Sequence, residues 1–128
     1  MRLTIAARGP VPAAEAWDRY ARPARWTEWS PYLVGVESST DGLRAGTAGR
    51  LRGPLRVTVP YTVTAVDEPA RTWAWDVRFG PVRLAFDHGV EPCGAGSRTW
   101  LIAHGPLPVL ALYLPVAWLS LNLLVRRR

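Results

Sequence analysis

Apolar and polar side chains alternate along residues 71–90, and this feature constrains the fold more than any other in the sequence. A period of two residues is that of a β-strand that buries one face. Gly80 and Pro81 interrupt the alternation and favour a turn. The segment therefore predicts two adjacent strands whose shared inner face carries Trp73, Trp75, Val77, Val82, Leu84, Phe86, His88 and Val90.

Strand patterns in other segments extend the predicted sheet. Residues 2–8 and 98–104 alternate over short runs, and residues 55–66 do so over a longer one. Residues 33–38 and the glycine-rich run 46–53 read as short strands with a turn between them. We expect six or seven antiparallel strands, and the later segments add these inner-face residues: Val57, Val59, Tyr61, Val63, Trp100, Ile102 and His104.

Helical spacing appears directly after the first strand. Residues 13–21 place apolar side chains three and four positions apart, and Pro12 suits the first turn of a helix. Pro23 ends this helix, because proline disfavours helical backbone in the residue before it. Trp26 and Trp29 are three residues apart, which predicts a second short helical turn.

The C-terminal segment 105–125 is apolar almost throughout, with only Ser120 and Asn122 polar, and three arginines follow it. About 20 apolar residues can span a bilayer, and a flanking arginine cluster is typical of a cytoplasmic end. A helix buried between a sheet and a ligand is also apolar on most faces. We favour such a lid helix and keep membrane contact through residues 109–128 as the alternative. Three prolines argue against a membrane-spanning helix, because they limit the continuous helix to roughly 17 residues: Pro106, Pro108 and Pro115.

Composition predicts one folded domain, residues 1–128, and argues against nucleic acid as a partner. Apolar residues make up 48% of the chain and charged residues 20%, as in globular proteins. The net charge is +6, but apart from the last three positions the basic residues, all arginine, are scattered. A solvated surface is therefore favoured over a phosphate-binding face.

Cysteine usage and the N-terminal segment predict an intracellular, cytoplasmic protein. Cys93 is the only cysteine, so the chain can form neither an intramolecular disulfide nor a cysteine-based metal site. The first residues lack the apolar core of a signal peptide. No phosphate-binding glycine loop, metal-ligand spacing or nucleophile elbow is present in the sequence, so we expect no metal and no cofactor.

Four segments carry a resemblance to a known family: RWTEWSPYLVGVE, LRAGTAGRLRG, VTAVDEPARTWAWDV and DHGVEPCGAGSRTWLIAHGPL. Together with the order of the elements, they resemble the SRPBCC superfamily, which includes START-domain, Bet v 1-like and polyketide cyclase/dehydrase proteins. The resemblance covers the whole chain. It implies an α+β helix-grip fold, in which a curved antiparallel sheet wraps around a long C-terminal helix and two short helices follow the first strand. It also implies a hydrophobic cavity between the sheet and that helix, used for lipids, polyketides or similar ligands.

Aromatic side chains are the candidate ligand contacts. Their rings offer large, rigid apolar surfaces, and the polar tip of a Tyr or Trp can orient a ligand. Each ring could equally be a core residue, because aromatics commonly fill protein interiors. The predicted cavity, with Trp29 near its mouth, is lined by Trp29, Tyr61, Trp73, Trp75, Phe86, His88, Trp100 and His104.

Two histidines are the catalytic candidates. His88 and His104 are the only titratable residues predicted on the inner face besides Tyr61, and a histidine pKa near 6.5 suits proton transfer at neutral pH. One of them could remove a proton next to a ketone while Tyr61 or a Trp N–H held the enolate oxygen. A hydrogen-bonded core histidine is the favoured alternative.

The sequence is compatible with three functions from different classes, because one fold can serve many activities. We favour binding of a hydrophobic small molecule, for transport or sequestration. The alternatives are a polyketide cyclase or aromatase that uses the same cavity, and a protein anchored to a membrane through its C-terminal helix.

Overall fold

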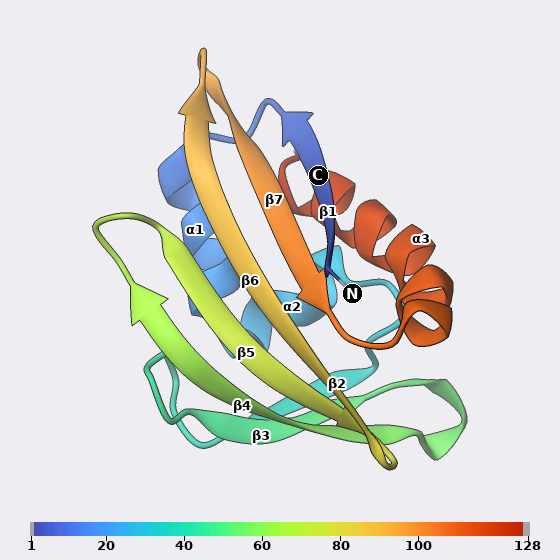
Figure 1. Ribbon diagram of the computed structural model, residues 1–128. Coiled ribbons are helices and arrows are strands. Elements are labelled where there is room, and N and C mark those ends of the chain that lie inside the picture. The colour runs from blue at the N-terminus through green and yellow to red at the C-terminus, as the bar shows by residue number, and fades with distance from the viewer. Residues whose placement is uncertain (1, 127–128) are drawn as a thin grey trace.

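The computed structural model describes residues 2–126 and confirms the predicted α+β helix-grip architecture (Figure 1). Two short helices follow the first strand, and a long helix ends the described chain, as expected. In chain order the elements are β1 (Arg2–Gly9), α1 (Ala13–Ala21), η1 (Pro23–Arg25), α2 (Trp26–Trp29), β2 (Gly35–Ser38), β3 (Ala48–Arg52), η2 (Pro54–Arg56), β4 (Thr58–Asp67), β5 (Thr72–Phe79), β6 (Val82–Cys93), β7 (Gly96–His104) and α3 (Leu107–Leu124).

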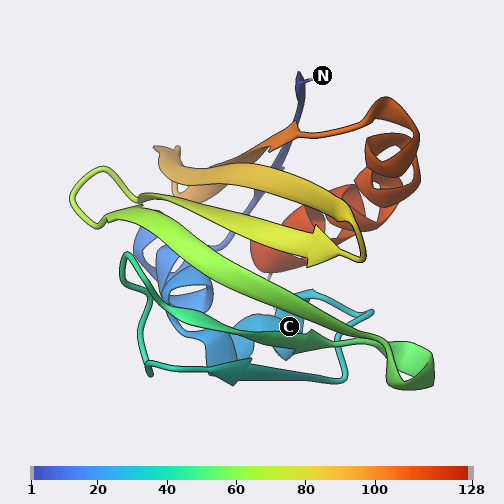
Figure 2. The ribbon, with the colours of Figure 1, turned by 60° about the horizontal axis from the view of Figure 1, so that its bottom comes forward.

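The strands form one antiparallel seven-stranded sheet in the order β1-β7-β6-β5-β4-β3-β2. Figure 2 shows the sheet curving, with β1 and β7 at one end and β2 and β3 at the other. The hairpin of β5 and β6 occupies the middle, where Trp73 pairs with His88 and Trp75 with Phe86. All four of these side chains are buried, which confirms the inner face predicted for residues 71–90.

The face predicted for β7 is wrong. Trp100 and His104 lie on the outer face of the sheet, whereas Leu101 and Ala103 point inward, directly across from His88 and Phe86. Both alternating sets of this strand contain apolar residues, so the pattern alone does not decide which set is inside, and a shift of one residue exchanges them. Smaller side chains face inward because α1 and α3 contact β7 on that side.

Trp100 has a structural role on the outer face, where its indole covers Gly89 of β6. The two residues pair across the strands, and a Cβ atom added to Gly89 would lie 2.1 Å from Trp100 Cζ2. A side chain at this position would force the indole that lies on it to shift, and the pair resembles the covering of sheet glycines by aromatic rings in other β proteins.

Arg19 of α1 forms hydrogen bonds with the C-terminal end of α3. Its side chain is 6% exposed. Arg19 Nη1 donates to the main-chain oxygens of Leu124 at 2.6 Å and Arg126 at 2.9 Å. The last carbonyls of a helix have no partner within the helix, so a buried guanidinium stabilises them.

α3 is an 18-residue helix, slightly longer than its prolines indicated. Pro108 lies in the first turn, where a missing N–H costs nothing, and Pro115 is accommodated inside the helix. The residues that α3 buries recur at helical spacing and hold it against the sheet and α2: Leu110, Ala117, Ser120, Leu121 and Leu124.

The contact between Gly89 and Trp100 gives a prediction for stability. Gly89→Ala should lower the free energy of unfolding by about 1–3 kcal/mol, because the new methyl group overlaps the indole. In a Trp100→Ala background the same change should cost much less, since the overlapping ring is gone. Urea denaturation of the four proteins of this cycle measures the coupling. Equal costs in both backgrounds would contradict the assigned contact.

Candidate functional site

A chamber of about 320 Å³ lies on the concave side of the sheet, at the end near η2. Its wall is formed by strands β3 to β6, by η2 and the residues on either side of it, by the segment before β2 and by one residue of α3. We call it the apolar chamber, and its lining is Tyr32, Leu33, Leu51, Gly53, Pro54, Leu55, Val57, Val59, Trp75, Val77, Phe79, Leu84, Phe86 and Tyr113.

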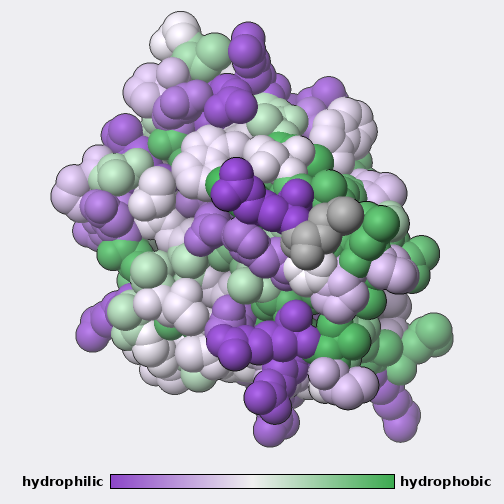
Figure 3. All heavy atoms as spheres, in the orientation of Figure 1, coloured by the Kyte–Doolittle hydropathy of each residue, from purple (hydrophilic) through white to green (hydrophobic). Residues whose placement is uncertain are grey.

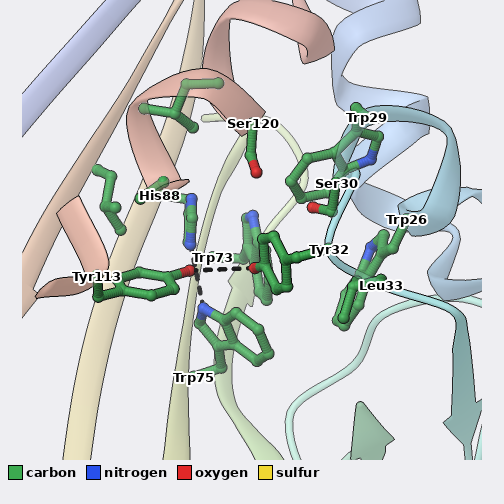
Figure 4. A pocket seen from close by; sticks show the side chains of 13 residues that line it. Trp26, Trp29, Ser30, Tyr32, Leu33, Trp73, Trp75, His88, Tyr113 and Ser120 are labelled. Carbon is green, nitrogen blue, oxygen red and sulfur yellow. Dashed lines mark hydrogen bonds between the residues drawn. The ribbon is translucent and has the colours of Figure 1, made fainter. Parts of the chain in front are cut away.

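A second, much smaller space of about 20 Å³ lies deeper in the domain (Figure 4). This volume holds roughly one water-sized group. Tyr32, Leu33, Trp75 and Tyr113 line both spaces, so the two are neighbours. We call it the inner pocket, and its lining is Trp26, Trp29, Ser30, Tyr32, Leu33, Trp73, Trp75, His88, Leu101, Tyr113, Ala117, Ser120 and Leu121.

Packed aromatic rings explain why the inner pocket is small. Trp26 is 1% exposed, and its ring lies 5.5 Å from that of Trp73 and 5.3 Å from that of Trp75. Its indole N–H donates to the carbonyl of Tyr20 at 2.9 Å, which fixes the ring against α1. The resemblance implied one deep cavity, but among the described residues these rings fill its inner part, and the ligand-sized space on the concave face lies toward η2.

His88 is buried in this cluster, with both ring nitrogens occupied. Its ring stacks on Trp73 with centroids 4.7 Å apart and an interplanar angle of 12°. His88 Nε2 accepts the indole N–H of Trp75 at 3.0 Å, so the proton of a neutral ring must be on Nδ1. His88 Nδ1 lies 3.4 Å from the Tyr20 hydroxyl and donates to it.

A series of hydrogen bonds leads from His88 through the hydroxyls of Tyr20 and Thr99 to the backbone of β6, and each group donates to the next one. The Thr99 hydroxyl donates to the carbonyl of Gly89 at 2.9 Å, so Tyr20 must donate to Thr99 Oγ1, at 2.6 Å. Each polar atom in this series of hydrogen bonds has a partner of the required kind, which is how buried polar groups are stabilised. His88 therefore links β5, α1 and β7 and offers no free lone pair to a ligand.

Burial lowers the pKa of His88 to about 3, because charging the imidazole inside the aromatic cluster is unfavourable. Burial also raises the pKa of both Tyr32 and Tyr113. The hydrogen bond with the Tyr113 hydroxyl partly opposes this rise in the pKa of Tyr32. At neutral pH the lining histidine and tyrosines are thus all uncharged.

The other predicted site residues fall into three groups. Trp75 and Phe86 line the apolar chamber, and Trp29 and Trp73 line the inner pocket. Trp29 is 6% exposed and donates its N–H to the Arg19 carbonyl, so it lies inside the domain and not at the mouth. Tyr61 is buried beside the rings but lines neither space.

Tyr61 and His104 direct their polar atoms away from both spaces. The hydroxyl of Tyr61 donates to the carbonyl of Glu37 at 2.9 Å. His104 Nε2 lies 3.1 Å from Asp87 Oδ2 on the outer face of the sheet. The hypothesis of a cavity base at His104 and an oxyanion donor at Tyr61 is therefore wrong for this geometry.

Sequence reasoning missed several lining residues, chiefly Tyr32, Ser30 and Tyr113. Tyr113 and Ser120 could have been found, because they are polar-tipped residues at the same helical spacing as Leu110 and Ala117 in the C-terminal segment. Nothing in the pattern marks Ser30 or Tyr32. Within residues 2–126, no group of three or more His, Cys, Asp or Glu side chains is arranged to hold a metal ion.

The pKa of His88 gives a prediction for the pH dependence of stability. Its folded value lies below the unfolded value of about 6.5, so its contribution is complete above that pH and is lost as the pH falls toward 3. Between pH 6.5 and 5 the free energy of unfolding should fall by roughly 2 kcal/mol, measured by urea denaturation.

His88→Gln should remove most of this pH dependence, whereas His104→Gln, at the half-buried histidine on the outer face, should keep it. The two variants form a matched pair, because each removes one of the two histidines of the chain. A slope that disappears with His104 and survives without His88 would show that the buried ring is not the titrating group.

Known proteins were compared with the chain by sequence and by structure. A family model described as "Polyketide cyclase / dehydrase and lipid transport" matches residues 2–118. A search of curated protein sequences found no significant match.

Several solved structures share the fold at low sequence identity. Ara h 8.0201 is 15% identical, with 97% of this chain and 95% of that chain covered and a TM-score of 0.78. XoxI from Bacillus cereus is 12% identical, with 97% and 92% covered and a TM-score of 0.82. The di-domain ARO/CYC BexL, from the BE-7585A biosynthetic pathway, is 16% identical with a TM-score of 0.80; 95% of this chain matches, and it spans 45% of BexL.

The family match and the shared fold agree with the curved sheet, the long C-terminal helix and the cavity between them. The chain belongs to the polyketide cyclase/dehydrase and lipid transport family of the SRPBCC, or Bet v 1-like, superfamily.

Proposed function

We propose that the chain binds a hydrophobic small molecule in the apolar chamber. One observation carries this proposal: a space of about 320 Å³ whose lining is almost entirely aliphatic and aromatic. Small-molecule sites are commonly about 300–1,000 Å³ and mostly apolar. Membership of a family described by polyketide cyclisation and lipid transport supports a ligand of lipid or polyketide type.

Entry to the chamber is proposed at η2. Leu55 lines the chamber and is nevertheless 94% exposed, and Phe79, which also lines it, is 51% exposed. Leu55 and Arg56 have φ values of 58° and 62°, a conformation that is unfavourable for side-chain-bearing residues. This segment is therefore a suitable place for the backbone to move when a ligand enters.

Filling the chamber tests the proposal. Val77 points into it from β5, and Arg78, the next residue, is exposed on the strand. Val77→Phe should weaken binding of the neutral fluorescent probe N-phenyl-1-naphthylamine at least tenfold, because the added ring occupies the ligand space, whereas Arg78→Phe should leave binding unchanged. Fluorescence titration measures both. Equal binding by the Val77→Phe and wild-type proteins would show that the probe, and the proposed function, do not use this chamber.

A cyclase function is less well supported by the geometry. Removal of a proton from a polyketide requires a base in contact with it. Within residues 2–126 no charged side chain lines either space, and both nitrogens of His88 are engaged inside the protein. Turnover of a poly-β-ketone by the purified chain would favour the cyclase alternative over binding alone.

Contact with a membrane surface is a second candidate, favoured by the outer face of α3. This helix has a mean hydropathy of 1.8, yet only 28% of it is buried, and its length would allow it to cross a membrane. Figure 3 shows hydrophobic residues gathered on this side of the molecule. Exposed members include Leu112 at 81%, Trp118 at 54% and Leu119 at 45%.

We favour α3 lying on a membrane surface over α3 spanning it. A span would break the bonds from Arg19 and remove Tyr113 from the chamber wall. An interfacial helix instead buries one apolar face in the lipid while its other face stays packed. The contact expected through residues 109–128 includes Arg127 and Arg128, which lie outside the described residues.

Removing the outer apolar side chains should weaken membrane contact. The double variant Leu112→Ser/Trp118→Ser should partition about tenfold less onto phosphatidylglycerol-containing vesicles, because it loses two large apolar contacts. Val34→Ser, at an exposed valine outside α3, is the control and should bind as the wild type. Co-sedimentation measures the bound fraction, and equal partitioning of all three proteins argues against this face.

A further inference from the structure

Two buried polar atoms in the inner pocket have no hydrogen-bond partner among the described residues: Ser30 Oγ and Trp73 Nε1. The two residues are 1% and 2% exposed, respectively. A buried polar group without a partner loses its hydration and gains nothing in return, so such groups are rare in folded proteins. Because both atoms lie in one space, we infer that a group from outside the protein forms hydrogen bonds with them there.

Trp73 differs in this respect from the other tryptophans of the pocket. The indole N–H of Trp26 donates to the Tyr20 carbonyl, that of Trp29 to the Arg19 carbonyl and that of Trp75 to His88 Nε2. The cluster thus satisfies three of its four indole N–H groups internally and leaves one directed into the open space.

Three elements bring polar atoms to this space, as Figure 4 shows. Ser30 directly follows α2, Trp73 comes from β5 and Ser120 from α3. The Ser120 hydroxyl donates to the Val116 carbonyl at 3.1 Å, so its oxygen can still accept a hydrogen bond. An oxygen atom placed here could accept from Trp73 and Ser30, and a hydroxyl could also donate to Ser120.

The size and charge of the inner pocket define the group that fits. About 20 Å³ accommodates roughly one oxygen-sized group. No Asp, Glu, Lys or Arg of the described chain lines the pocket, and burial lowers the pKa of its histidine so that the ring is neutral. A carboxylate would be buried without a counter-charge, which is strongly unfavourable. A neutral hydroxyl or carbonyl oxygen meets both conditions.

We propose that the inner pocket binds the neutral oxygen of an alcohol, phenol or ketone whose apolar body occupies the apolar chamber. This inference rests on the proposed function and specifies its ligand class. Tyr32 and Tyr113 line both spaces and mark the passage between them. Their hydroxyls are 3.3 Å apart, a long hydrogen bond that is weak enough for an entering ligand to replace.

The test compares two probes of nearly equal size, 2-naphthol and 2-methylnaphthalene, which differ by a hydroxyl in place of a methyl group. Dissociation constants are measured for the wild type, for Ser30→Ala and for Ser38→Ala, a control that removes a hydroxyl outside both spaces. The ratio of the two constants in the wild type, divided by the ratio in a variant, cancels the difference in water solubility between the probes.

Ser30→Ala should lower the relative preference for 2-naphthol about three- to tenfold, the worth of one buried hydrogen bond, and Ser38→Ala should leave it unchanged. Without ligand, Ser30→Ala should be as stable as the wild type or more stable, because it removes an unpaired buried hydroxyl. A loss of preference that accompanied unfolding would not meet this expectation and would overturn the assignment.

A second measurement reports on Trp73 directly. Its indole proton resonance, identified by its absence in Trp73→Phe, should shift on addition of 2-naphthol much more than on addition of 2-methylnaphthalene. If both probes bind with the same relative preference in wild type and Ser30→Ala, and shift this proton equally, the polar subsite is wrong and the proposed function survives. If neither probe binds the wild type, both proposals fail.

Discussion

The stack of His88 on Trp73, together with the hydrogen bond from Trp75 to the imidazole, is the contact on which the concave face depends. Through Tyr20 and Thr99 it joins the central hairpin to α1 and β7. Every donor and acceptor in this series of hydrogen bonds is used, so the imidazole is held neutral and in one tautomer. A histidine in such a position contributes to architecture, and its chemistry is not available to a ligand.

The same cluster divides the cavity expected from the family into two unequal parts. Tryptophan rings fill the inner part, and the ligand-sized space on the concave face lies beside η2, where the wall is aliphatic and aromatic. The chamber can supply apolar contact area, and the inner pocket can supply hydrogen bonds from Trp73, Ser30 and Ser120. Apolar area without polar contacts discriminates poorly between similar molecules, whereas a buried donor that must be satisfied rejects a ligand lacking the matching acceptor.

α3 contributes to both the inside and the outside of the molecule. Its inner residues pack on the sheet and α2 and provide Tyr113 to the cavity wall, and its outer residues form an exposed apolar surface. This double role explains why the sequence of the segment is apolar almost all round, and why a membrane helix remained an alternative to the favoured lid helix. The bonds from Arg19 to its last carbonyls join it to the domain.

The sequence by itself determined the fold class, the strand pairing of residues 71–90 and the inner faces of β4 to β6. In those strands one alternating set holds the large apolar side chains and the other holds the charged and small residues, so only one face is suited to burial. In β7 both faces carry apolar residues, so only the packing of α1 and α3 decided that Leu101 lies inside and Trp100 outside. Whether Trp73 finds a hydrogen-bond partner, and whether Ser30 faces the same space, depend on three elements meeting at one point. Tertiary structure alone decides such a meeting, because a side chain's partners are set by distances in space that no spacing along the chain encodes.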